Sequence, residues 1–281
     1  MATKHQVGVV RELWRYPVKS MLGERLDQLT AGQGGVAGDR AWALRDVTSG
    51  NILSAKKWPR LLEFQSRYLT PPNGGAGDVL IQLPDGSTIR AADPKASQAV
   101  SEALGHQARL ERVAAGVKSK AEIDTATIFG DVPVEQLLPG FTNTTLPDVF
   151  KLPPGTFFDT AIIHVVSSGT LEHLRSLSPK GTVIDPRRYR PNIYIETAPH
   201  LSGFVEDAWG NATLIVGESL RIVEMKPALR CVMTTHRQSE LPRDLGILRT
   251  AAQHHQANVG VFASVGSPGT VRCGDPVFIE D

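Results

Sequence analysis

The stretch Lys226-Pro-Ala-Leu-Arg-Cys-Val-Met-Thr-Thr235 decides how the rest of the chain is interpreted. It follows a strand-like run at 219–225 and places Cys231 directly after Arg230. A guanidinium beside a thiol favours the thiolate, which is the form that acts as a nucleophile or binds a metal. The simpler alternative is that Cys231 is a small buried side chain in a strand-rich core.

The second cysteine, Cys273, lies in an alternating, strand-like segment at 270–279, in which Gly274-Asp275 is expected to form a turn or bulge. We expect Cys273 to be a structural residue. Two cysteines far apart, without CxxC spacing, argue against a zinc knot or an iron–sulfur cluster held by this chain alone. A disulfide between them is a poor first expectation for a protein of the cytosol.

Composition and charge exclude several classes of protein. The length of 281 residues predicts one large or two medium domains. A formal net charge of +1 gives no overall field that favours nucleic acid or a membrane surface, so an anion site must come from local clustering. We expect no membrane anchor, since the sequence holds no apolar run of about 18 residues. The N-terminus lacks a signal-peptide pattern, so the predicted location is cytoplasmic.

The hydrophobic pattern predicts a mostly β protein with about three helices, an α+β chain whose short strands suit a barrel or sandwich. A strand is expected at 7–18. One helix should begin at Asp93, as N-cap, and end at Gly105, and others are expected at 169–177 and 244–256. The proline-rich segment 139–156 is expected to be a long loop, acting as a lid or a partner surface.

Several cations precede or follow the expected strands. The run Arg187-Arg188-Tyr189-Arg190 is either a solvated basic face or an anion site. Arg190 precedes Pro191-Asn192 and an apolar strand, so its guanidinium should be fixed at the strand entrance and suited to bidentate anion binding. The same reasoning applies to Lys19-Ser20 and to Arg40.

Ser167 and Ser168 lie between an expected strand and an expected helix. Backbone N–H groups at a helix N-terminus are favourable for phosphate. The alternative is ordinary N-capping by a serine, and both roles are compatible.

Five short motifs occur in the order seen in MOSC-domain proteins, in the branch that contains the mitochondrial amidoxime-reducing components and their bacterial relatives. The resemblance covers nearly the whole chain and implies an N-terminal β-barrel domain at 5–115 and a MOSC β-barrel domain at 125–281. The motifs are Tyr16-Pro-Val-Lys-Ser20, Gly38-Asp-Arg-Ala-Trp42, Arg188-Tyr-Arg-Pro-Asn192, Arg230-Cys-Val-Met-Thr-Thr235 and Gly274-Asp-Pro-Val277.

The resemblance implies a molybdenum cofactor, in which a pyranopterin dithiolene and one protein cysteine hold the metal. By motif position that ligand is Cys231, and a soft thiolate suits such a metal. Arg230 would shape the pocket beside the metal. The positions that match cofactor-binding positions of the family are Lys19, Ser20, Arg40, Arg190 and Asn192, with Ser167 and Ser168 at the family's strand-to-helix loop.

The implied activity is the reduction of N-hydroxylated compounds, such as amidoximes and hydroxylamines, to amidines and amines. The ferredoxin-like domain of one bacterial branch is not found before Asp281. We therefore expect a small-molecule substrate and a separate electron-donor protein of the flavin, iron–sulfur or haem type. Where the family usually continues with Val-Asp, this chain has His236-Arg237-Gln238, a segment expected near the substrate entrance. His236 is either a proton donor there or an ordinary surface histidine.

Two other functions stay open on the sequence. A sulfur-carrier protein would hold a persulfide on an exposed Cys231 and need no pterin. A non-catalytic protein that binds or delivers the cofactor would hold pterin without turnover.

Overall fold

The computed structural model describes residues 3–72, 77–122, 128–130, 132–137, 140, 149–153 and 155–281. The predicted loop at 139–156 falls largely outside these residues. No helix in the described ranges is long and apolar enough to cross a membrane.

Strands dominate the described structure. The strands are β1 Lys4–Arg15, β2 Glu24–Leu26, β3 Gln28–Gly32, β4 Gly35–Val36, β5 Trp42–Asp46, β6 Gln65–Thr70, β7 Asp78–Gln82, β8 Thr88–Arg90, β9 Ala108–Arg112, β10 Lys120–Glu122, β11 Val149–Lys151, β12 Ile163–Ser167, β13 Ile193–Thr197, β14 Thr213–Val216, β15 Leu220–Leu229, β16 Asn258–Ser267, β17 Gly269–Arg272 and β18 Pro276–Glu280. The α-helices are α1 Ala96–Leu104, α2 Val134–Leu137, α3 Ser168–Leu177 and α4 Gly246–His255, and the 3₁₀ helices are η1 Pro59–Glu63, η2 Pro186–Tyr189, η3 Val205–Ala208 and η4 Val232–Thr235.

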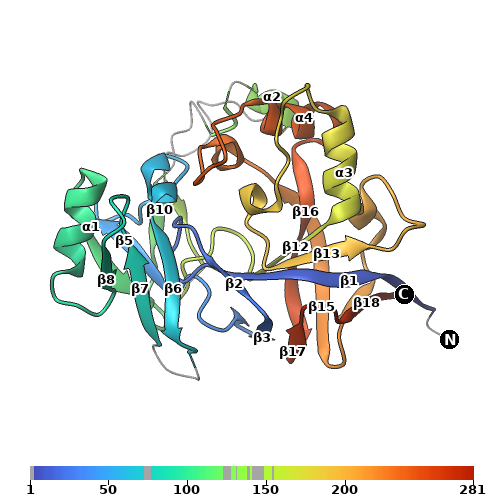
Figure 1. Cartoon of the computed structure of the whole chain (residues 1–281), viewed down its shortest axis with the longest axis horizontal. Helices are drawn as coiled ribbons and strands as arrows, with labels where there is room; N and C mark the ends of the chain where they lie inside the picture. Colours follow the sequence, from blue (N-terminus) through green and yellow to red (C-terminus); the bar gives the residue numbers. More distant parts are fainter. Residues whose placement is uncertain are drawn as a thin grey trace.

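A closed seven-stranded barrel forms the right-hand part of the molecule in Figure 1. Its strand order is β13-β12-β16-β15-β14-β18-β1, and β1 closes it by pairing with β13, while β2 extends β1 on the outside. Only the β12–β13 pair is parallel, because the crossover helix α3 joins these two strands. Apolar side chains of every barrel strand fill the interior, as the alternation of inward and outward positions along a strand requires.

A second core lies in the N-terminal part, on the left in Figure 1. It is built by the β5–β9 pair, the β6-β7-β8 sheet and α1. Residues 16–22, which follow β1 directly, enter this second core, because Val18 and Met21 are fully buried in it. The chain therefore crosses from one core to the other within one short segment.

The fold prediction of a mostly β chain is confirmed, with four α-helices among the described residues where about three were expected. The strand expected at 7–18 is β1. The helix expected from Asp93 begins only at Ala96, because Asp93 accepts a hydrogen bond from the backbone N–H of Lys95 in a preceding turn. Its end at Gly105, in the left-handed conformation, is as predicted. The domain ranges 5–115 and 125–281 stay a prediction.

Candidate functional site

A cavity lies where residues 16–22 cross between the two cores. Below, it is called the cationic cavity. Its walls come from the segments 19–20, 158–164, 189–192 and 230–233, together with two further side chains. Six of the residues selected from the sequence line it, namely Lys19, Ser20, Arg40, Arg190, Asn192 and Arg230. The fold thus brings together residues that are far apart in the chain.

Three of the lining residues adopt a left-handed backbone that side chains normally avoid. The φ angles are +68° at Ser20, +50° at Arg40 and +56° at Arg190. A non-glycine residue in this region costs of the order of 1 kcal/mol or more, and such residues gather at binding sites. The backbone is therefore held in place where it presents these side chains to the cavity.

Two lysines share one carboxylate at the cavity wall. Asp159 accepts a hydrogen bond from Lys19 and lies 2.7 Å from Nζ of Lys56. Burial lowers the pKa of Lys19 to about 8, although Asp159 opposes this effect. Burial alone would raise the pKa of Asp159, but the charges of Lys19 and Lys56 hold it well below its usual range. Asp159 is therefore a carboxylate at neutral pH.

Asn192 and Asp39 hold the loop that carries Arg40. Asp39 pairs with the Arg40 guanidinium and accepts the backbone N–H of Tyr16 at 2.7 Å. The side-chain amide of Asn192 donates to Asp39 at 3.0 Å and accepts the backbone N–H of His164 at 3.1 Å. Asn192 is fully buried, so it acts by positioning strands and the loop around the cavity.

Arg190 is the cation whose bonding is least complete. Its guanidinium packs over the Tyr16 ring with 4.1 Å between Cζ and the ring centroid, and Nη1 donates to the Met21 carbonyl at 2.7 Å. The buried Nη2 atom has no hydrogen-bond partner. Burial lowers the pKa of Arg190 to about 10. A buried donor without a partner is costly, which suggests that its partner is a ligand.

The other two arginines of the same run have different roles. Arg187 is paired with Asp185 at 2.9 Å and with Glu240 at 2.6 Å. Arg188 is fully buried and donates to main-chain carbonyl groups on the segment that follows Cys231. These acceptors are Thr234, His236 and Pro242, at 3.4, 3.3 and 2.8 Å. Arg188 therefore fixes the Cys231 segment, and Arg190 alone of the three lines the cavity.

Arg230 connects the cavity to the cysteine. Its Nη2 donates to the Tyr189 carbonyl at 2.7 Å, and Nη1 lies 3.4 Å from Nε2 of His164. Burial and the adjacent Arg230 charge lower the pKa of His164 well below its usual range, so this imidazole is neutral. Burial lowers the pKa of Arg230, and the negative charge of a Cys231 thiolate opposes that effect.

The two cysteines lie in different environments. Both are free thiols. Cys231 is half-buried at the start of η4. The prediction that Cys273 is a structural core residue is wrong, because Cys273 is exposed. The segment 270–279 forms β17 and β18 on either side of a turn at Gly274, where φ is +92°, so the turn or bulge expected at Gly274-Asp275 is confirmed.

Ser167 and Ser168 are not brought to the cationic cavity. Ser167 caps α3 by accepting the Thr170 N–H at 3.3 Å, so the N-capping alternative is confirmed. Its own N–H donates to the buried carboxylate of Glu206 at 2.6 Å, and Ser168 Oγ accepts the Thr197 N–H at 2.9 Å. The groups expected to meet a phosphate are engaged within the protein.

His236 is half-buried and not an open surface residue. Its Nε2 atom has no hydrogen-bond partner, and burial lowers its pKa. A neutral imidazole near neutral pH is a poor proton donor.

Two domain models match the chain. The MOSC N-terminal beta barrel domain matches residues 7–119, and the MOSC domain matches residues 153–278. The chain belongs to the MOSC-domain proteins.

Relatives within this group match along almost the whole chain. The MOSC-domain chain is 25% identical to mitochondrial amidoxime-reducing component 1 of Homo sapiens, over 98% of its own length and 83% of the relative. It is 26% identical to the same component of Mus musculus, over the same shares. Among solved structures, the YuaD protein from Bacillus subtilis aligns with a TM-score of 0.48 and 14% identity, over 100% of this chain and 99% of that one.

Three residues of this MOSC-domain protein were missed by the sequence reasoning: Lys56, Asp159 and His164. His164 had a usable signal, because it is a polar residue inside an otherwise apolar strand. Lys56 and Asp159 are isolated charges in loops, and nothing in their local sequence separates them from surface residues. Only the folded chain brings both to Lys19.

Proposed function

We propose that this MOSC-domain protein is a molybdenum-cofactor-dependent oxidoreductase that reduces N-hydroxylated compounds, with Cys231 as the protein ligand of the metal. The observation that carries the proposal is the cationic cavity, which Arg230 lines next to Cys231 in the chain, and where Arg190 and Arg230 each keep a buried nitrogen without a partner. No carboxylate among the described residues forms an ion pair with either arginine. The names of the relatives point the same way.

The residues of the cavity fit an anionic cofactor. A phosphate and a dithiolene carry negative charge, and Lys19, Arg40 and Arg190 offer cations; burial of Lys19 and Arg190 strengthens their interactions. No group of three or more His, Cys, Asp or Glu side chains that could hold a metal occurs within the described ranges. A metal held by one cysteine therefore needs further ligands from outside the protein, as a dithiolene provides.

The cofactor, when bound, supplies two-electron oxygen-atom chemistry, and this chain supplies binding and positioning. An amidoxime gains two electrons and two protons, its N–O bond breaks, and the products are an amidine and water. Lys19, Ser20, Arg40, Arg190 and Asn192 would hold or position the anionic part of the cofactor. Arg230 would keep Cys231 as a thiolate next to the metal. Ser167 and Ser168 would stabilise α3 only.

The electrons would come from a separate donor protein of the flavin, iron–sulfur or haem type, in the cytoplasm. The sequence has two cysteines, fewer than the four that hold an iron–sulfur cluster. The protein therefore needs an external source of reducing equivalents for each turnover.

The deciding experiment measures molybdenum and oxidised-pterin content of the wild type and of Cys231→Ser, both made in a host that synthesises the cofactor. We expect near-stoichiometric metal and pterin in the wild type and a strong loss of metal in the variant, followed by benzamidoxime reduction by the wild type with a chemical reductant. Cys273→Ser is the matched control and should keep both. Persulfide on Cys231 without metal or pterin would replace the proposal with a sulfur-carrier role, and bound pterin without reduction would indicate a carrier of the cofactor.

A further inference from the structure

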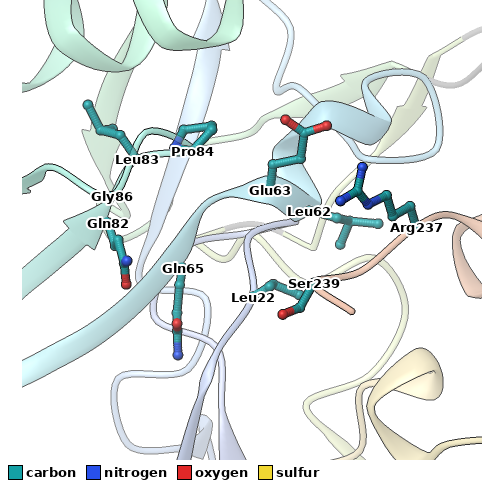
Figure 2. Close-up of a pocket in the computed structure, with 10 residues that line it drawn as sticks. All are labelled: Leu22, Leu62, Glu63, Gln65, Gln82, Leu83, Pro84, Gly86, Arg237 and Ser239. Atoms are coloured by element: carbon teal, nitrogen blue, oxygen red, sulfur yellow. The ribbon is translucent and has the colours of Figure 1, made fainter. Parts of the chain in front are cut away.

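Two more pockets continue outward from the cationic cavity. The inner pocket shares Arg190 with that cavity, and the outer pocket shares Leu22, Gln65 and Ser239 with the inner one. Figure 2 shows the outer pocket between N-terminal segments and the segment that carries Arg237 and Ser239. The shared residues place the three spaces in a row, with Arg190 between the cationic cavity and the inner pocket.

Gln238 in the inner pocket is anomalous. Its side chain is 2% exposed, and neither its amide nitrogen nor its amide oxygen has a hydrogen-bond partner. Arg190, whose Nη2 is also without a partner, lines both this pocket and the cationic cavity. Buried polar groups in folded proteins are nearly always paired, so the two unpaired amide atoms of Gln238 in one small pocket point to a ligand.

The main chain holds Gln238 in a fixed position. Its N–H donates to the Leu241 carbonyl at 3.0 Å, and the Leu241 N–H returns to the Gln238 carbonyl at 2.8 Å. Ser239 takes a left-handed φ of +51° within this turn. Arg188 binds carbonyls on both sides of the turn, at His236 and Pro242. Such rigidity is what a recognition group requires, because little freedom is lost on binding.

We propose that Gln238 and Arg190 recognise the polar head of the substrate, which is a neutral planar N-hydroxylated group with a donor and an acceptor on one edge. An amidoxime and a hydroxamic acid both present that edge. The Gln238 amide offers the complementary acceptor and donor, and the Arg190 guanidinium, which lines this pocket as well as the cationic cavity, adds a positive charge beside an oxygen of the head. This proposal rests on the function proposed above and adds the side chains that recognise its substrate.

The walls of the two pockets fit the rest of such a molecule. Trp14 and Tyr16 line the inner pocket and suit a planar group. The outer pocket has a volume of about 330 Å³ and includes Leu22, Leu62 and Leu83. An apolar cavity of about 150 Å³ accepts one benzene ring, so the outer pocket has room for a ring with substituents.

The charges along the three spaces favour a neutral head over a cation. Arg190 and Arg187 line the inner pocket, where Arg187 is paired with Asp185 and Glu240, and Arg237 and Glu63 both line the outer one, as Figure 2 shows. The amidine product is protonated at neutral pH, so the arginine charges oppose its retention. The substrate should therefore bind more tightly than the product.

The test uses the cofactor-loaded protein without reductant, so that ligands bind and are not consumed. Calorimetry compares benzamidoxime, benzohydroxamic acid and benzamidine on the wild type, Gln238→Met and Gln98→Leu. Gln98 lies exposed on α1 and bonds Glu102, and it serves as the remote control. We expect Gln238→Met to bind both N-hydroxylated ligands about tenfold more weakly, since two hydrogen bonds are lost. Gln98→Leu should bind them unchanged, and benzamidine should bind weakly throughout.

Two further readouts separate recognition from a structural role. With a chemical reductant, Gln238→Met should raise KM for benzamidoxime about tenfold and leave kcat within about twofold. Its melting temperature should be no lower than that of the wild type, because an unpaired buried amide is replaced by an apolar chain of the same length. Gln238→Glu keeps the size of the side chain, but its carboxylate would pair with Arg190. This variant should therefore also bind benzamidoxime more weakly.

Unchanged affinity and KM in Gln238→Met would overturn the inference while leaving the proposed function standing. Loss of pterin or molybdenum from Gln238→Met would also overturn it, because Gln238 would then serve the cofactor. Benzamidoxime that binds through Gln238 but is never reduced by the wild type would overturn the proposed function and keep the pocket as its recognition site.

Discussion

The cationic cavity and the N-terminus of α3 were both predicted to bind an anion, and the structure treats them in opposite ways. At α3, the carboxylate of Glu206 already accepts hydrogen bonds from Ser167 and Thr170 inside the protein. At the cavity, Arg190 and Arg230 keep buried nitrogens without partners. Both regions were expected to present hydrogen-bond donors to an anion. What differs is whether the protein itself has satisfied the donors.

The largest expected effect concerns cofactor content. Replacing Arg190 by leucine removes a charge and the unpartnered donor, and we expect the pterin content of the isolated protein to fall about tenfold or more, since charge-assisted hydrogen bonds contribute about 1.5–3 kcal/mol each. Ser168→Ala is the counterpart at α3 and should leave pterin content unchanged. Pterin loss in Ser168→Ala, or its retention in Arg190→Leu, would reverse the comparison.

An intermediate effect is expected from the titration of Lys19. Burial lowers the pKa of Lys19 to about 8. If the charged amine is needed to bind an anion, affinity falls as pH rises through this value, to about a tenth at pH 9. This pH dependence of affinity is measured by calorimetry of sulfate binding to the cofactor-free protein, because sulfate does not titrate in this range. Lys19→Arg stays charged and should show a flat profile. A wild-type profile equally flat would exclude Lys19 from the site.

The smallest effect is expected at Glu206, whose pKa is raised by burial, although hydrogen bonds from Thr170 and Ser167 oppose the shift. A carboxyl with a raised folded-state pKa contributes stability that is present below about pH 4.3 and is lost as pH rises through the folded value. Glu206→Gln should therefore gain stability relative to the wild type as pH rises, by a few degrees in melting temperature. A constant difference between pH 4 and 8 would contradict this.

Particular residues show how far sequence reasoning extends. The strand before the 16–20 motif and the end of α1 at Gly105 follow from local patterns, because alternation and a left-handed cap are properties of short segments. Cys273 was misjudged: a turn was expected at Gly274-Asp275, but the exposure of the neighbouring thiol was not. The roles of Arg187, Arg188 and Arg190 were not separable either, because the partners that distinguish them, Glu240, Pro242 and Met21, lie more than 40 positions away in the sequence.

The sequence alone determined that this chain is a mostly β MOSC-domain protein with Cys231 next to a guanidinium. Strand alternation and short motifs are patterns of neighbouring residues, so they can be recognised without the fold. The tertiary structure decided which cations face the cavity, that Asp159 and Lys56 join them, and that Gln238 stands beside Arg190 with an unpaired amide. The physical reason is that burial and hydrogen-bond pairing are properties of contacts between distant segments, and no local pattern records which donors remain unpaired once the chain has folded.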